Sequence, residues 1–209
     1  MPGAEQRMAG GSSVRWLLWL GLGLVLLAVL GVLIYGRLVG QAAPPPTADV
    51  AGSGVTARQA FALASELAMQ WQEDAGLAAV SGHWPAVGTH LGDQVEWAYQ
   101  FFSPSTQRLA LITVAGGEAR VVRESVSPYV IPTFPVEKWR VDSDQALQMW
   151  WNHGGKSLVA RRPDASLAMQ LRMPDGGGPD PVWTVAGFVG GTETAITAVV
   201  NATDGRLVE

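Results

Sequence analysis

The chain of 209 residues contains no cysteine, and only 15% of its residues are charged. Without cysteine it has no disulfide, no thiolate zinc site, no cysteine nucleophile and no lipidated cysteine. Its formal net charge of −4 differs from the basic balance that is typical of nucleic-acid-binding proteins. The length suits one or two small domains rather than a large multidomain enzyme. We therefore expect no nucleic-acid partner.

The sequence also lacks the motifs that carry common chemistry. It contains no phosphate-binding loop, no nucleophile elbow and no cluster of metal ligands. Its three histidines, His83, His90 and His153, are not spaced as metal ligands. We expect no catalytic, metal-binding or cofactor-binding residues, and we interpret the protein as a non-enzyme. An enzyme with a pocket beneath a sheet is the least favoured alternative.

One long uncharged run is present, from Trp16 to Gly36. A helix rises about 1.5 Å per residue, so roughly 20 apolar residues cross the hydrocarbon layer of a bilayer. The aromatic residues Trp16, Trp19 and Tyr35 lie near the two ends of the run, as in interfacial aromatic belts. The run predicts a transmembrane helix over residues 16–39, preceded by a tail of residues 1–15.

The flanking charges favour one orientation of this helix. Arg7 and Arg15 precede the run and Arg37 follows it, a slight bias that favours a cytoplasmic N-terminus. We therefore expect a single-pass protein of the cell membrane whose C-terminal region is extracytoplasmic. A cleaved signal peptide ending near residues 40–43 is the alternative, although the apolar part of a signal peptide is usually shorter.

A linker connects the apolar run to the rest of the chain. Residues 40–54 contain three consecutive prolines and mostly small side chains, which favour a semi-rigid spacer over a packed core. From residue 41 onward the chain has 11 of the 14 Lys and Arg and 17 of the 18 Asp and Glu, a net charge of −6. This balance argues against a basic patch that binds anionic lipid.

The region after the linker contains a weak internal duplication at an offset of 86 residues, without a gap. Each copy has a helix-capping residue three positions before a glutamine, the spacing of a capping box, and Trp97 corresponds to Trp183. The duplication divides the region into residues 55–126 (unit 1), 127–140 (connector) and 141–209 (unit 2).

Hydrophobic periodicity predicts one helix and several strands in each unit. In unit 1 the helix is expected over residues 57–75, with Gly76 as its C-cap, and in unit 2 over residues 143–153, ended by Gly154 and Gly155. The strands are expected over residues 77–81, 95–101, 108–114 and 119–126, and over 167–173, 182–188, 192–200 and 206–208. The predicted fold class is α+β, with a helix on an antiparallel sheet in each unit after the transmembrane helix.

The end of unit 2 resembles the PepSY domain family. The residues that carry the resemblance are the strand Pro181–Val185, the strand Ile196–Val200 and the turn Asn201–Val208, where Asn201 replaces the aspartate that is usual in the family. The resemblance covers about 70 residues directly and reaches unit 1 only through the duplication. It implies one helix packed on an antiparallel sheet, an extracytoplasmic location and a non-catalytic role in peptidase inhibition or as a membrane-anchored accessory protein.

Aromatic residues are abundant in and around the connector, and two interpretations stay open for them. They form either a groove that binds a peptide or a partner subunit, or a glue that packs the two units together. The candidate protein-binding residues are Trp139, Trp150, Trp151, Tyr129 and Phe134.

The leading hypothesis is a membrane-anchored module that binds a protein or peptide, with a peptidase or a membrane complex as the expected partner. It would act as an accessory, inhibitory or scaffolding component. The alternative is a structural subunit of a larger membrane complex, with the anchor helix as its main contact.

Overall fold

The computed structural model describes residues 54–87, 96–190 and 193–208, all of which belong to one compact unit, Pro44–Glu209. The helical elements are α2 (Ala57–Trp71), the 3₁₀ turn η1 (Val136–Lys138), α4 (Ser143–Trp150), the π-helix η2 (Trp151–Gly155) and α5 (Lys156–Arg161). The strands are β1 (Gly76–Trp84), β2 (Trp97–Ser103), β3 (Arg108–Ala115), β4 (Glu118–Val126), β5 (Ser166–Arg172), β6 (Val182–Val189) and β7 (Glu193–Asn201).

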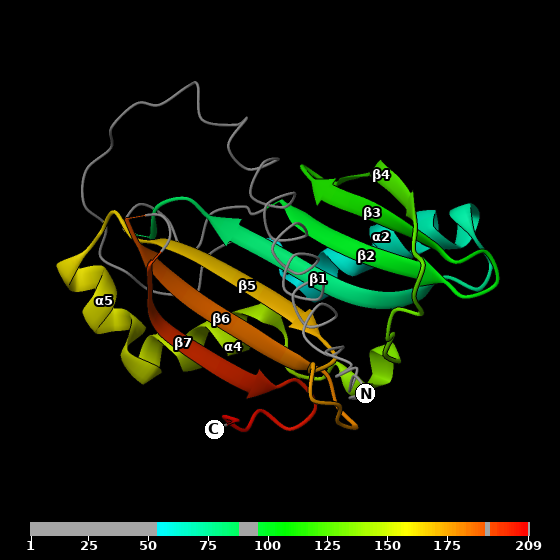
Figure 1. The fold of residues 1–209 in the computed structure, drawn as a ribbon. Coiled ribbons are helices and arrows are strands. Elements are labelled where there is room, and N and C mark those ends of the chain that lie inside the picture. Colours follow the sequence, from blue (N-terminus) through cyan, green and yellow to red (C-terminus); the bar gives the residue numbers. More distant parts are fainter. Residues whose placement is uncertain (1–53, 88–95, 191–192, 209) are drawn as a thin grey trace, which may run out of the picture. The chain divides into compact units, whose positions relative to one another are not determined.

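The seven strands form one antiparallel sheet in the order β4-β3-β2-β1-β5-β6-β7 (Figure 1). The α+β class is thus confirmed for the described region. The two expected units share this sheet, because β1 of the first half pairs directly with β5 of the second. The predicted transmembrane helix and most of the linker lie outside the described residues. Among the described residues, no helix is long and apolar enough to cross a membrane.

One face of the sheet is apolar across its whole width. Directly opposite residues of neighbouring antiparallel strands share a face, and one such row runs through all seven strands. This row consists of Val121, Ile112, Tyr99, Val80, Leu171, Trp183 and Val200. All but Val121 are completely buried, and the three described α-helices pack on this side (Figure 1). The neighbouring row faces the other side and is mainly small or polar: Arg120, Thr113, Ala98, Ser81, Gln170, Thr184 and Val199.

Both helix N-termini carry the predicted capping box. Thr56 and Gln59 form it in α2, and Asp142 and Gln145 form it in α4. In each box the side chain of the cap and that of the third helical residue satisfy backbone N–H groups that have no partner within the helix. Helix α2 ends earlier than expected, at Trp71, and Gly76 is not its C-cap but the first residue of β1.

The two halves contain the same tryptophan contact at positions that the duplication makes equivalent. The indole Nε1–H of Trp97 donates to the carbonyl oxygen of Val55, and that of Trp183 donates to the carbonyl oxygen of Val141, both over 2.8 Å. Donor and acceptor are separated by 42 residues in both bonds. Each indole therefore fixes the chain just before a helix to the second strand of its own half.

The offset between the halves is not constant, in contrast to the expectation. Val80 of β1 pairs with Tyr99 of β2, and Met169 of β5 pairs with Val185 of β6. Tyr99 and Val185 are 86 residues apart, whereas Val80 and Met169 are 89 residues apart. The second half thus has three additional residues between the start of its helix and its first strand. With this offset of 89 residues, Ser81 in the first half corresponds to Gln170 in the second. The same two residues pair with each other across β1 and β5, so the local two-fold axis that relates the two strands passes through this pair.

The additional residues lie where the second helix was expected to stop. Gly154 interrupts the helix as expected, because its φ and ψ angles are non-helical, but a second short helix, α5, follows the kink and continues to Arg161. Gly154 takes a φ of +123°, which glycine adopts at little cost, and the kink lies there. The side chain of Leu158, beyond the kink, is buried against the sheet.

Candidate functional site

The five candidate residues do not form one exposed groove. Trp139 and Trp150 are completely buried, Phe134 is 4% exposed, and Trp151 is half-buried. Only Tyr129 is freely accessible, with 73% of its surface exposed. A partner therefore reaches Tyr129 and part of Trp151 in this conformation, but not the other three side chains. The protein-binding role of the accessible residues stays a prediction.

Trp139 joins the two halves inside the core. Its ring lies edge-on to Phe61 of α2 at 5.7 Å and to Trp183 of β6 at 6.0 Å between ring centroids. The guanidinium carbon of Arg58 lies 6.0 Å from the Trp139 centroid, within the range of a cation–π contact. This packing agrees with the interpretation of the connector as a glue between the halves. The sequence signal was the aromatic content of the connector, which does not distinguish a glue from a groove.

The connector crosses the chain at the start of β1, where it contacts the sheet. The side chain of Thr133 lies against Gly76, where an added Cβ would be 2.9 Å from its methyl group. The next residue, Phe134, donates its backbone N–H to the carbonyl oxygen of Leu77 over 3.0 Å and buries its ring in the core. This crossing fixes the path between β4 and α4.

Trp150 packs on backbone that carries no side chain. A Cβ on Gly155 would lie 2.5 Å from its ring, and a Cβ on Gly187 would lie 2.9 Å from it. Its Nε1–H donates to the carbonyl oxygen of Ile196 over 3.3 Å. Close approach to glycine backbone thus makes room for a large indole between η2 and the sheet.

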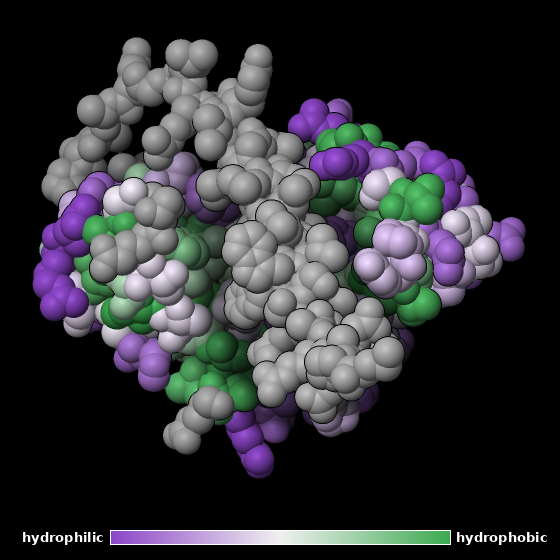
Figure 2. Space-filling model, in the orientation of Figure 1, coloured by the Kyte–Doolittle hydropathy of each residue, from purple (hydrophilic) through white to green (hydrophobic). Residues whose placement is uncertain are grey.

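The end of β4 and the first part of the connector expose three large apolar side chains, Val126, Tyr129 and Val130, which we call the apolar strip. Their exposed fractions are 73%, 73% and 72%, the highest among the exposed large hydrophobic side chains of the described region. The hydroxyl of Ser127 donates to the carbonyl oxygen of Tyr129 over 2.7 Å and so holds the turn within the strip. Figure 2 shows hydrophobic and hydrophilic residues interspersed on the visible described surface.

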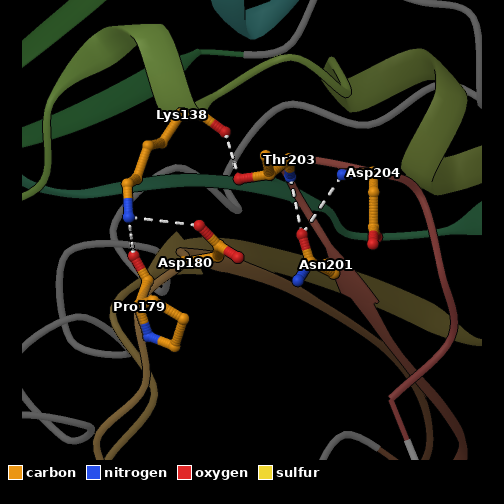
Figure 3. Close-up of polar contacts among 6 residues, drawn as sticks. All are labelled: Lys138, Pro179, Asp180, Asn201, Thr203 and Asp204. Carbon is orange, nitrogen blue, oxygen red and sulfur yellow. Dashed lines mark hydrogen bonds and ion pairs between the residues drawn. The ribbon is translucent and has the colours of Figure 1, made fainter.

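A polar cluster surrounds the turn that carries the family resemblance (Figure 3). The ammonium group of Lys138 donates to the carbonyl oxygen of Pro179 and lies 3.2 Å from a carboxylate oxygen of Asp180. The side-chain oxygen of Asn201 accepts the backbone N–H groups of Thr203 and Asp204 over 2.8 and 3.2 Å. Asn201 therefore performs the acceptor role in the turn that a carboxylate would also perform.

Electrostatically, this cluster is a structural brace. The pKa of the Asp180 carboxyl is held below its ordinary value of 3.8, and the largest cause is its hydrogen bond with the Lys138 ammonium group. The hydroxyl of Thr203 donates to the backbone oxygen of Lys138 over 2.8 Å and ties η1 to the turn. These partners keep Asp180 charged and the turn fixed, an arrangement that does not prepare a general acid.

The described residues contain no group of three side chains suited to bind a metal ion. His83 lies in β1 and His153 in η2, whereas His90 lies outside the described residues. Burial raises the pKa of the Tyr99 hydroxyl, which is the largest pKa change in the described region. The carboxylate of Asp142 raises the pKa of Tyr99 further by a smaller amount. The Tyr99 hydroxyl donates to the carbonyl oxygen of Ala57 over 2.5 Å, so it has a structural partner inside the core.

Comparisons with known proteins give no relative for this chain: no family model, curated protein or solved structure matches it.

Proposed function

We propose that the chain is a membrane-anchored, extracytoplasmic module that binds a protein and has no catalytic activity. The observation that carries the proposal is the apolar strip, in which three large apolar side chains are exposed within five residues of the chain, because exposed apolar patches are typical of interaction sites. Tyrosine in such a position is also typical of residues that dominate binding energy. The partner that we propose is a protein or peptide, such as a peptidase or a component of a membrane complex.

The arrangement of each half supports the PepSY-like part of the proposal. The resemblance implies one helix on an antiparallel sheet, and α2 packs on β2, β3 and β4 as α4 packs on β6 and β7. The resemblance also implies that such a module acts by binding rather than by catalysis. The uncharged run of residues 16–36 supports the anchor, and the weak bias of arginines supports the orientation.

Site-specific photo-crosslinking in native membranes tests the binding site. A photoreactive amino acid placed at position 129 in the full chain is expected to capture a discrete partner. The matched control is position 69, because Met69 is also an exposed apolar residue, at 61%, but lies on α2. Capture at position 129 and not at 69, abolished by Val130→Ser, would support the proposal.

The opposite outcomes have distinct meanings. Equal capture at both positions would show that the strip has no special role and would overturn this site. A stable partner that is retained by the anchor segment alone would instead favour the structural-subunit alternative.

The absence of cysteine makes the orientation directly measurable. We expect a single cysteine introduced at the exposed Glu118 to react with a membrane-impermeant maleimide in intact cells, and one at Ala4 to react only after lysis. Labelling at Ala4 but not at Glu118 in intact cells would reverse the proposed orientation.

A further inference from the structure

The first part of the connector is held at two points and has no main-chain partner between them. The backbone N–H of Ser127 donates to the carbonyl oxygen of Gln107 over 2.8 Å, and that of Phe134 donates to the carbonyl oxygen of Leu77 over 3.0 Å. Ser127 and Phe134 are both buried. Within the described region, none of the backbone N–H groups of residues 130–133 donates to another group. The segment is therefore fixed at both ends while its middle stays available.

Proline restricts the backbone of this segment. The rings of Pro128, Pro132 and Pro135 fix φ at about −65°. A residue that precedes proline avoids the α region and takes β or polyproline II angles, which applies to Ile131 and Phe134. Pro135 has a φ of −70° and a ψ of 137°, close to the polyproline II values of about −75° and about 145°. A polyproline II helix has no internal hydrogen bonds, which agrees with the unpaired N–H groups.

Burial along the segment follows the three-residue period of a polyproline II helix. Ile131 is half-buried and Phe134, three residues later, is buried. The other side chains of residues 130–135 are exposed. A strand would alternate between exposed and buried positions every two residues instead. One face of the segment therefore packs on the protein through Ile131 and Phe134, whereas Pro132 and Pro135, also three residues apart, share a face that is open to solvent.

The chemistry of this open face indicates the kind of partner that fits it. Residues 125–136 carry no charge, so recognition depends on the packing of rings rather than on ion pairs. Proline rings of a polyproline II helix are bound in grooves that are lined by aromatic side chains. Tyr129, which is highly exposed, lies three residues before Pro132 and adds an aromatic side chain at the same spacing.

We propose that residues 130–135 bind, as a preformed polyproline II helix, in a groove of a partner protein that is lined by aromatic side chains. This inference rests on the proposed protein-binding function and names the class of partner and the mode of binding. The fixed ends at Ser127 and Phe134 reduce the conformational entropy that is lost when the segment binds. Because the segment is uncharged, high salt is expected to weaken binding by less than about twofold.

The conformation of the segment is tested on the full chain in mild detergent by amide hydrogen exchange. We expect the amides of Val130, Ile131 and Thr133 to exchange within about tenfold of the rate of an unstructured peptide. The amides of Ser127 and Phe134, which have carbonyl acceptors, are expected to exchange at least about a hundredfold more slowly. Slow exchange at Val130 or Thr133 would show that the segment has a main-chain partner of its own and would overturn the inference.

The partner is tested by photo-crosslinking from position 129 of the full chain in native membranes. Pro132→Ala removes a ring from the open face and is expected to lower the yield of the cross-linked product at least fivefold. Pro104→Ala is the matched control, because Pro104 is also exposed but lies in the turn between β2 and β3. Mass spectrometry of the product is expected to place the cross-link beside a tryptophan or tyrosine of the partner.

Each other outcome separates this inference from the proposed function. Equal yields from Pro132→Ala and the native chain would overturn recognition of the proline face and leave the protein-binding function standing. A product that high salt abolishes would assign binding to charged residues and would also overturn the inference. No product from position 129 in the native chain would overturn both. If Pro132→Ala does not fold, the salt dependence and the cross-linked site of the native chain decide.

Discussion

The hydroxyl oxygen of Ser143 accepts the backbone N–H of Ala57 over 3.0 Å, and the two residues are 86 positions apart. They are equivalent residues of the two halves, each the first residue of its helix. Beside them the carboxylate of Asp142 accepts the backbone N–H of Arg58 over 3.1 Å. Residues at the start of the second helix therefore also satisfy the first, which couples the folding of the two halves.

This shared cap leads to a first prediction. Ser143→Ala leaves the buried N–H of Ala57 without its acceptor, so the free energy of unfolding is expected to fall by about 1–3 kcal/mol. The measurement is denaturant unfolding of the full chain in mild detergent, followed by tryptophan fluorescence. Ser65→Ala is the matched control, because the Ser65 hydroxyl donates to the carbonyl oxygen of Ala62 in an exposed hydrogen bond within α2. Equal loss in both variants would argue against a shared cap.

The paired indoles predict unequal effects of the same substitution. Trp183→Phe is expected to cost about 3 kcal/mol and Trp97→Phe about 2 kcal/mol, because both lose volume and one hydrogen bond. The difference arises because the bond of Trp183 to Val141 is buried, whereas Val55, the acceptor of Trp97, is 43% exposed and reachable by water. The same unfolding measurement compares the two variants. A larger loss of stability for Trp97→Phe than for Trp183→Phe would contradict the view that the hydrogen bond of Trp183 is the more buried of the two.

Glycine 187 is expected to resist even the smallest side chain. A Cβ at this position would lie 2.6 Å from Leu158 Cδ2 and 2.9 Å from Trp150 Cζ2. Gly187→Ala should therefore destabilise the protein by about 2 kcal/mol through overpacking. Gly176→Ala is the control, since no atom lies within 4 Å of its added Cβ. Near-native stability of Gly187→Ala would show that the helix after the kink is not packed as described.

The brace between η1 and the last turn predicts a pH effect. Because the pKa of Asp180 is lowered in the folded protein, its contribution to stability is present above 3.8 and is lost as the pH falls through the depressed pKa. Lys138→Met is expected to raise the pKa of Asp180 toward its ordinary value, as measured by NMR titration of the carboxyl carbon. The pKa of Asp164, lowered chiefly by its hydrogen bond with Arg162, should not change. An unchanged pKa of Asp180 would contradict the brace.

Local features of the fold were predictable from local patterns. Both capping boxes followed from a capping residue and a glutamine three positions later, and β3 and β4 followed from the turn residues that bound them. The equivalence of Trp97 and Trp183 followed from their fixed spacing. Each of these predictions depends on residues close in sequence or on a repeat visible in it.

The pairing of β1 with β5 was not predictable in the same way, because no sequence signal states which strand of one unit meets the other unit. Gly154 and Gly155 indicated the break in the helix but not the further helix α5, because the burial of Leu158 beyond them is visible only in the folded chain. The aromatic residues were correctly recognised as unusual, but whether Trp139 lies in a core or a groove depends on its contacts with Phe61 and Trp183.

The position of the shared cap has a mechanical consequence. The described chain begins at Gly54, and within three residues it reaches the bond between Ala57 and Ser143. Tension transmitted along the backbone from residues before 54 would thus act on the bond between Val55 and Trp97 and then, two residues later, on the seam between the halves, rather than at an outer strand. Force on the segment before residue 54 would load both halves together, and the contact between the halves would be the point at which the protein yields to that force.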